Sequence, residues 1–307
     1  MHLIPKKTLL SAAVTLVVFA SQLSAGAWTQ KKRGYFLKLS GNYLSTTSEF
    51  NFLGKKNDIF AEHFGFTNAS FRDFNISFYG EYGLSSRFTV ISSLAFKSLQ
   101  SNRTELIGGG QLENDVAIHT PGFSDLWLSG RYNLLKLPLV FSLQGGVKIP
   151  LGYAEEPSNS GAALGTANFD GELQLLVGQS LHPTPIYLTA GGGYRTRGGR
   201  FHDEWIYSFE AGYTLKKTLF KITLDGIHNA KRPIPDIYGM TVITPLPGGG
   251  GVRPVSNIGN QDVLKISPSI FYSVQQNIDV QLELINIVAG KNSITGSTFS
   301  LGIILKK

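Results

Sequence analysis

The stretch LVFSLQGGVKI at positions 139–149 alternates between apolar and polar side chains with a period of two residues. Its large apolar side chains hold the odd positions: Leu139, Phe141, Leu143, Val147 and Ile149. The even positions hold the polar residues Ser142, Gln144 and Lys148, together with Val140 and Gly146. Because successive side chains of a β-strand point to opposite faces, the stretch predicts a strand with one apolar face and one polar face.

The same period recurs along the chain in about twelve segments. They are 34–44, 71–82, 87–98, 123–134, 139–149, 169–180, 186–196, 203–214, 219–229, 262–273, 278–289 and 296–306. Each is 11 or 12 residues long. A tilted membrane-spanning strand needs roughly 9–11 residues, whereas strands of soluble sheets usually have about 5–6. Segment length therefore favours strands that cross a membrane.

The connections between these segments alternate in length. Short ones lie at 83–86, 135–138, 181–185, 215–218 and 274–277, and long polar ones at 45–70, 99–122, 150–168 and 230–261. Short periplasmic turns that alternate with long extracellular loops are typical of outer-membrane barrels. We therefore predict an all-β fold, a closed antiparallel up-and-down transmembrane β-barrel that forms one domain over residues 28–307. Pro268 lacks a backbone N–H, so we expect a bulge or local break there.

Aromatic side chains gather near both ends of the segments. Beside the short turns lie Tyr35, Tyr82, Phe88, Tyr132, Tyr187, Tyr213, Phe220 and Tyr272, and at the far ends lie Tyr43, Phe96, Tyr194 and Trp205. Two such bands match the interfacial girdles of a membrane barrel. The alternative is the ordinary enrichment of aromatic residues in any β-sheet.

The N-terminus reads as an export signal. Lys6 and Lys7 precede an apolar stretch at 8–20, which is shorter than the roughly 20 residues of a spanning helix, and Ala25-Gly26-Ala27 form an A-x-A cleavage site. We predict that residues 1–27 are a cleaved signal peptide. The expected location is then the bacterial outer membrane, with its lipid and its insertion machinery as partners.

Composition excludes several classes of function. The chain has no cysteine, which rules out disulfides, thiolate metal sites and cysteine nucleophiles. It has 28 Lys and Arg against 21 Asp and Glu, a net charge of +7, without a basic stripe of the kind that binds nucleic acid. We therefore predict no nucleic-acid partner.

Two neighbouring stretches carry a resemblance to a known family. GFSDLWLSGRY at positions 122–132 and LQGGVKIP at 143–150 resemble a family of outer-membrane barrels that is named for a phenol-degradation pathway and described as transporters or channels. The resemblance implies the same barrel fold and location, and a role in transport.

Charged residues on the polar faces are candidates for a lumen. Twelve strands about 4.8 Å apart and tilted by about 40° enclose a backbone diameter of roughly 24 Å, of which side chains leave about 10 Å. Besides Lys97, Asp125 and Glu172, we place eight lumen or constriction candidates there: Lys38, Arg131, Lys148, Arg195, Glu210, Asp225, Lys265 and Glu283. Lys38, Glu210 and Glu283 lie nearest to mid-strand. The mixed signs fit either a path with weak charge preference or paired charges that only stabilise the barrel.

The first segment begins soon after the cleavage site, so an N-terminal plug is not expected. Any plug should come from the long connection at 45–70 or from that at 230–261. Beyond the signal peptide the histidines are His63, His119, His182, His202 and His228, and no nucleophile motif accompanies them. We predict no catalytic residue, metal or cofactor.

Three functions remain open. The first is a passive channel or transporter for a small solute through a narrow polar lumen. The second is a structural or surface-binding barrel, whose loops act as an adhesin or receptor. The third is a hydrolase with its site on the barrel wall. A fold does not by itself decide among them.

Overall fold

The computed structural model describes residues 26–61, 65–107, 112–136, 139–155, 157–158, 161–231, 242–244, 251–253 and 260–307. The strands of its main sheet are β1 (Tyr35–Thr46), β4 (Phe66–Gly83), β5 (Phe88–Ile107), β6 (Leu112–Phe123), β7 (Leu126–Leu135), β8 (Val140–Ile149), β9 (Asp170–Ser180), β10 (Ile186–Arg197), β11 (Glu204–Leu215), β12 (Thr218–Asn229), β15 (Asp262–Gln275), β16 (Ile278–Lys291) and β18 (Ser297–Lys306). Short strands outside this sheet are β2 (Ser48–Phe50), β3 (Lys56–Asp58), β13 (Val242–Thr244), β14 (Gly251–Arg253) and β17 (Ser293–Ile294).

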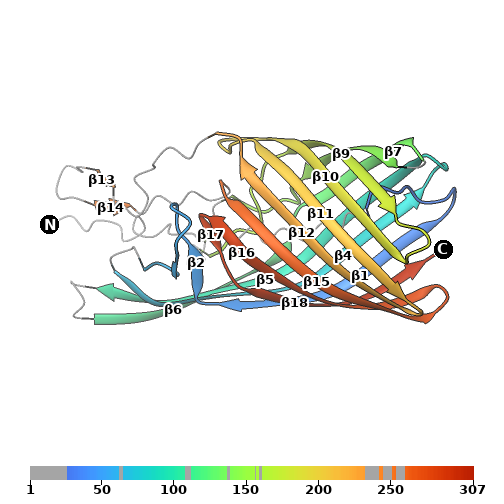
Figure 1. The fold of residues 1–307 in the computed structure, drawn as a ribbon. Coiled ribbons are helices and arrows are strands. Elements are labelled where there is room, and N and C mark those ends of the chain that lie inside the picture. Colours follow the sequence, from blue (N-terminus) through green and yellow to red (C-terminus); the bar gives the residue numbers. More distant parts are fainter. Residues whose placement is uncertain are drawn as a thin grey trace.

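The main sheet closes into a barrel of twelve antiparallel strands (Figure 1). β6 and β7 are two parts of one strand, because both pair with β5 on either side of a break at Ser124 and Asp125. Closure comes from β1, which pairs with β4 on one side and with the last strand, β18, on the other. Closure leaves the barrel wall without a free edge, as a membrane requires.

The alternation read from the sequence sets which face each side chain occupies. Outward rows carry large exposed apolar side chains, such as Phe74, Phe209 and Leu301. Inward rows carry buried polar side chains, such as Asn75, Gln144 and Ser267. The prediction of a closed barrel with an apolar exterior and a polar interior is therefore confirmed.

One connection differs from its prediction. Residues 99–122 were expected to form a loop, but β5 runs on to Ile107 and pairs with β6 from Phe96↔Phe123 to Ile107↔Leu112. The two strands form a hairpin that projects beyond the end of the barrel (Figure 1). Much of the polar stretch is therefore strand, because its backbone groups pair with each other beyond the barrel wall.

The pairing of β15 with β16 is interrupted at Pro268, as the predicted local break requires, while the register stays the same on both sides. The pairing of β15 with β16 passes from Ile266↔Asn286 directly to Ser269↔Glu283, whereas on its other side Pro268 stays in register with Ile222 of β12. A proline cannot donate to a ladder, so the interruption lies on the side where its N–H would be needed.

The barrel has two unlike ends. At one end, here called the turn end, short connections join β4 to β5, β11 to β12 and β15 to β16, and β1 begins and β18 finishes there. The opposite end is called the loop end. Of the connection 230–261, predicted as a possible plug, most lies outside the described residues. Among the described residues, no helix is long and apolar enough to cross a membrane.

Candidate functional site

The residues just before β1 lie inside the barrel at the turn end. We call residues 26–33 the N-terminal segment. Near β1 it follows β4 and β5: the Arg33 N–H donates to the Gly83 carbonyl at 2.7 Å, and the Gln30 N–H donates to Thr89 Oγ1 at 2.8 Å. The Gln30 side chain also donates to Glu81 at 2.6 Å. The segment therefore runs along the inner wall, held mainly by hydrogen bonds.

Further along, polar side chains of the wall hold the backbone of the segment. Arg131 on β7 donates to the Trp28 carbonyl at 2.9 Å, and Ser142 on β8 donates to the Ala27 carbonyl at 2.5 Å. Arg131 is fully buried and also faces Glu81 at 3.3 Å and Gln144 at 3.0 Å. One guanidinium group thus links the segment to β4 and β8.

The tip of the segment is apolar and packs on apolar side chains of the inward rows. Ala27, Val140 and Leu176 form a small buried cluster, with Trp28 against it. The Trp28 ring meets the edge of Tyr187 at 5.8 Å between centroids. The expectation that no N-terminal plug exists is therefore wrong. A few residues are enough to fill part of the lumen, because the wall supplies both hydrogen-bond partners and apolar side chains on which these residues pack.

A cavity of about 440 Å³ remains beside the tip of the segment. Its apolar lining consists of Trp28, Phe36, Tyr187, Leu219 and Phe271. Tyr187, predicted to belong to an aromatic girdle, instead faces inward: its hydroxyl donates to Glu210 at 2.8 Å. The N-terminal segment occupies the side of the lumen from β4 to β10, so the cavity is the space left towards β1, β12 and β15.

Charged side chains line the rest of the lumen as paired groups. The pairs are Lys38–Glu283 (3.7 Å), Arg131–Glu81 (3.3 Å), Lys148–Asp170 (2.6 Å), Arg195–Glu172 (2.9 Å), Arg195–Glu204 (2.9 Å), Lys221–Glu210 (3.0 Å) and Lys265–Asp225 (3.0 Å). Each joins adjacent strands or strands one apart, so the pairs follow the wall around the barrel.

All eight lumen candidates belong to this set of pairs. The barrel places Lys38 and Glu283 together, and places Glu210 with Lys221 rather than with either of them. Sequence reasoning missed four acceptors and donors of the set: Glu81, Asp170, Glu204 and Lys221. Each of them occupies an inward row, which was the available signal.

At the loop end, two connections fold inward and pack on the wall. Ala162 and Leu164, from the β8–β9 connection, pack with Ile59 and Phe60 and with inward residues of β1, β4 and β5 in one buried apolar cluster. Ser124, at the break between β6 and β7, donates to the Leu164 carbonyl at 2.7 Å. Of the predicted plugs, 45–70 contributes to this cluster. The connection 150–168, which was not predicted, contributes as well.

Polar contacts hold the β8–β9 connection in place. Tyr153 donates a short hydrogen bond to Asp125, and Lys148 donates to Thr166. Burial and the carboxylate of Asp125 raise the pKa of the Tyr153 hydroxyl, so the hydroxyl stays protonated and remains a donor. A Cβ on Gly165 would lie 2.1 Å from the Tyr153 hydroxyl oxygen, so only glycine fits there.

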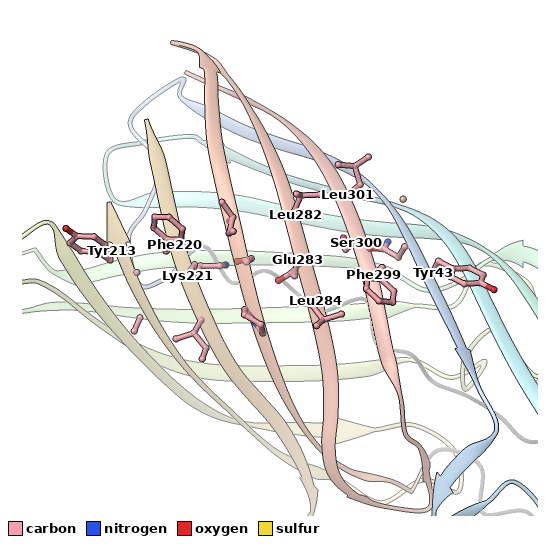
Figure 2. Close-up of a pocket in the computed structure, with 18 of the residues that line it drawn as sticks. Tyr43, Tyr213, Phe220, Lys221, Leu282, Glu283, Leu284, Phe299, Ser300 and Leu301 are labelled. Carbon is pink, nitrogen blue, oxygen red and sulfur yellow. The ribbon is translucent and has the colours of Figure 1, made fainter. Parts of the chain in front are cut away.

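A second hollow, of about 1130 Å³, lies on the outer face over β11, β12, β15, β16, β18 and β1. Figure 2 shows large side chains from neighbouring strands along it, among them Tyr43, Phe220 and Phe299. Pro268 and Leu284, where the pairing of β15 with β16 is interrupted, also line it. Its apolar side chains belong to the outward rows, so it is part of the surface that faces lipid.

The histidines in the described part of the chain give no common site. Among the described ones, His119 on β6 contacts Ser98 Oγ at 2.7 Å, and His228 on β12 contacts Asp262 at 3.2 Å. His63 lies outside the described residues. Within the described part of the chain, no group of three or more His, Asp or Glu side chains could hold a metal ion.

Searches against protein-family models and curated proteins found no match. Among solved structures, an outer-membrane channel from Pseudomonas putida F1 has a TM-score of 0.62 at 12% identity, over 92% of this chain and 98% of that chain. The transport unit of the autotransporter AIDA-I from Escherichia coli reaches 0.49 at 10% identity, over 95% and 94%. The KdgM porin in complex with disordered oligogalacturonate reaches 0.45 at 7%, over 88% and 98%. The first of these similarities shows that this chain has the closed twelve-stranded fold of an outer-membrane β-barrel.

Proposed function

We propose that this chain is a passive channel of the bacterial outer membrane for small solutes. The observation that carries the proposal is the cavity at the turn end: the N-terminal segment fills one side of the lumen and leaves about 440 Å³ on the other. The sequence resemblance to barrels named for a phenol-degradation pathway supports the same role.

The proposal includes an orientation and a processing step. The turn end lies in the periplasm and the loop end outside the cell, as short and long connections do in such barrels. The outer-membrane insertion machinery places the barrel in the lipid, and residues 1–27 are removed as a signal peptide. Cleavage after Ala27 removes Gly26 and Ala27 from the tip of the N-terminal segment and leaves residues 28–33 along the inner wall, held through Trp28 and Gln30. The intact mass of the purified protein would report Trp28 as the first residue.

Transport is tested by electrical recording. Protein purified from outer membranes and reconstituted into planar lipid bilayers should give reproducible conductance steps, and the same preparation denatured by heat should give none. Lys38→Met and Glu210→Gln should shift ion selectivity in opposite directions, because each removes one charge from the lumen wall. Lys55→Met, at an exposed position of the β2–β3 connection, is the matched control and should leave the selectivity unchanged.

A second function is favoured by the packing of the lumen. The apolar cluster at the loop end and the N-terminal segment at the turn end both occupy the interior. A barrel that gives no conductance in bilayers would therefore be a structural or surface-binding protein. The third alternative is a hydrolase with its site on the barrel wall, and lipase and protease assays on the folded protein would test it.

A further inference from the structure

We propose that the turn end of the barrel is an interaction surface for anionic phospholipids of the periplasmic leaflet, whose phosphate groups its basic side chains bind. The inference rests on the orientation given in the proposed function, which places the turn end in the periplasm, but it does not depend on transport. It gives a partner to a set of charges that lies outside the lumen.

The connections at the turn end carry basic residues and no acidic ones. They are 84–87, 136–139, 181–185, 216–217 and 276–277, and residues 28–34 precede β1 at the same end. Together with the end of β18 they supply nine lysine and arginine residues: Lys31, Lys32, Arg33, Arg87, Lys136, Lys216, Lys217, Lys306 and Lys307. At the loop end, by contrast, Asp58 and Glu113 are exposed as well as Lys55 and Lys56. The barrel therefore concentrates positive charge at one end.

Few acidic side chains neutralise this charge. Lys306 pairs with Asp279 on β16, and Glu81 on β4 is buried in the lumen against Arg131. Within the part of the chain that the structure describes, none of the other eight basic side chains forms an ion pair, and all eight are exposed. Like charges that are not neutralised create a positive potential, which attracts anions. The turn end therefore favours an anionic partner outside the protein.

Exposed tyrosines show at which depth these basic residues lie. Tyr82, Tyr132, Tyr213 and Tyr272 lie on the outer face near the turn end and are 43–51% exposed. Tyrosine side chains are enriched at the interface between membrane and water, where the ring lies at the level of the lipid headgroups. The four tyrosines therefore mark the headgroup level of the periplasmic leaflet.

The backbone places basic residues just beyond three of these tyrosines. In each case, the residue that follows the tyrosine shares a backbone hydrogen bond with a basic residue of an adjacent segment. These bonds run from the Arg33 N–H to the Gly83 carbonyl (2.7 Å), from the Asn133 N–H to the Arg87 carbonyl (2.8 Å) and from the Ser273 N–H to the Lys217 carbonyl (2.8 Å). One residue advances a strand by about 3.3 Å. The basic residues therefore begin at the depth of the lipid phosphates.

The basic residues surround the barrel and do not form a single patch. They come from the segment before β1, from the β4–β5, β7–β8 and β11–β12 connections, and from the end of β18. In the closed sheet, β9 and β10 separate β8 from β11, and β15 and β16 separate β12 from β18 (Figure 1). A protein partner usually covers one patch of about 800 Å², whereas lipid contacts the whole circumference. The distribution therefore favours phospholipid over an acidic protein.

The lipid preference of the reconstituted protein tests this surface. The full-length protein is placed in vesicles of phosphatidylcholine, and electron paramagnetic resonance of spin-labelled phosphatidylglycerol and phosphatidylcholine measures how strongly each lipid associates with it. At a salt concentration of about 0.01 M, phosphatidylglycerol should be preferred by about threefold, as exposed ion pairs allow. At about 1 M salt, where the Debye length is roughly 3 Å, the preference should disappear. Equal association of the two lipids at low salt would overturn the proposal.

Matched triple variants show whether the turn end is responsible. Lys136→Gln, Lys216→Gln and Lys217→Gln together remove three of the nine positive charges, so the preference should fall by about a third. Lys55→Gln, Lys56→Gln and Lys231→Gln remove three exposed lysines at the loop end and should leave it unchanged. Equal effects of the two triple variants, or no effect of the first, would contradict the surface.

An acidic protein as the partner would give a different result. In that case poly-L-glutamate would bind to the protein in phosphatidylcholine vesicles while the preference for phosphatidylglycerol stayed absent, and the lipid proposal would be wrong. The outcome is also separable from that of the proposed function. Conductance steps without a lipid preference would keep the channel and overturn the surface, whereas a lipid preference in a protein that gives no conductance would support the surface alone.

Discussion

Arg131 holds together parts of the molecule that are distant in sequence. Its guanidinium contacts the Trp28 carbonyl, Glu81 and Gln144. Both Arg131 and Glu81 are fully buried. An ion pair in such surroundings is not a source of large net stability, but removing one partner leaves the other charged and buried.

Arg131→Met should therefore lower the free energy of unfolding by about 3–5 kcal/mol, since Glu81 loses its cation. It should also raise the mean conductance, because the Trp28 carbonyl loses its donor and the N-terminal segment is held less firmly. Urea unfolding in lipid vesicles measures the first effect and bilayer recording the second.

The controls separate charge from packing. Glu81→Gln combined with Arg131→Met removes both charges and should recover part of the lost stability while the conductance stays high. Arg200→Ala, at an exposed position near the loop end, should change the stability by less than about 0.5 kcal/mol. A single Arg131→Met variant as stable as the wild type would show that the buried pair has no such role.

Among the elements that fill the lumen, the β8–β9 connection depends on one glycine. A side chain at Gly165 would collide with the Tyr153 hydroxyl that binds Asp125. Gly165→Ala should displace the connection from the loop end and increase the conductance. The matched control is Gly192→Ala on β10, where an added Cβ meets no atom within 4 Å.

Labelling can follow this displacement directly, because the chain has no cysteine of its own. Leu164→Cys should react slowly with a membrane-impermeant maleimide, since position 164 is buried, and at least about tenfold faster when combined with Gly165→Ala, because exposure governs thiol reactivity. Equal labelling rates in the two backgrounds would mean that the connection does not move.

The strands themselves could be read from the sequence, and the fillers of the lumen could not. A strand is specified locally, by the period of two in a segment such as 139–149. The N-terminal segment and the β8–β9 connection are held by contacts between residues far apart in the chain, such as Ser142 with Ala27 and Ser124 with Leu164. No local sequence pattern in either segment predicts these long-range contacts.

A signal for the fillers nevertheless exists in the wall. Val140 and Leu176 are apolar residues in otherwise polar rows, and the tip of the N-terminal segment packs against them. Leu44, Phe71 and Leu99 interrupt the inward rows of three other strands and mark the inserted connections at the loop end. An apolar residue in the polar row of a barrel strand is therefore a sequence-level sign that something other than water lies against it.

At the scale of the whole molecule, the apolar side chains of the outward rows make the barrel stable in a lipid bilayer. Leu282→Arg places a charge on the outer face of β16, where the leucine is 59% exposed. It should destabilise the barrel in lipid vesicles by about 2–4 kcal/mol, as charges near the middle of a bilayer do.

The matched control for this prediction is the same substitution outside the barrel wall. Leu53→Arg changes a more exposed leucine of the β2–β3 connection, at 70% exposure, and should alter the stability by less than about 0.5 kcal/mol. Urea unfolding in vesicles measures both. Equal effects of the two variants would mean that the outer face does not meet acyl chains.

Closure between β1 and β18 has a consequence for biogenesis. The last seam pairs Phe36 with Lys306 and Leu44 with Thr298, so it cannot form before β18 has been synthesised and exported. The residues that precede β1 are attached to one side of that seam, and Trp28 among them lies inside the barrel at the turn end. Barrel closure therefore encloses the N-terminal segment. We expect this segment to bind the inner wall in an intermediate in which β1 and β18 have not yet paired.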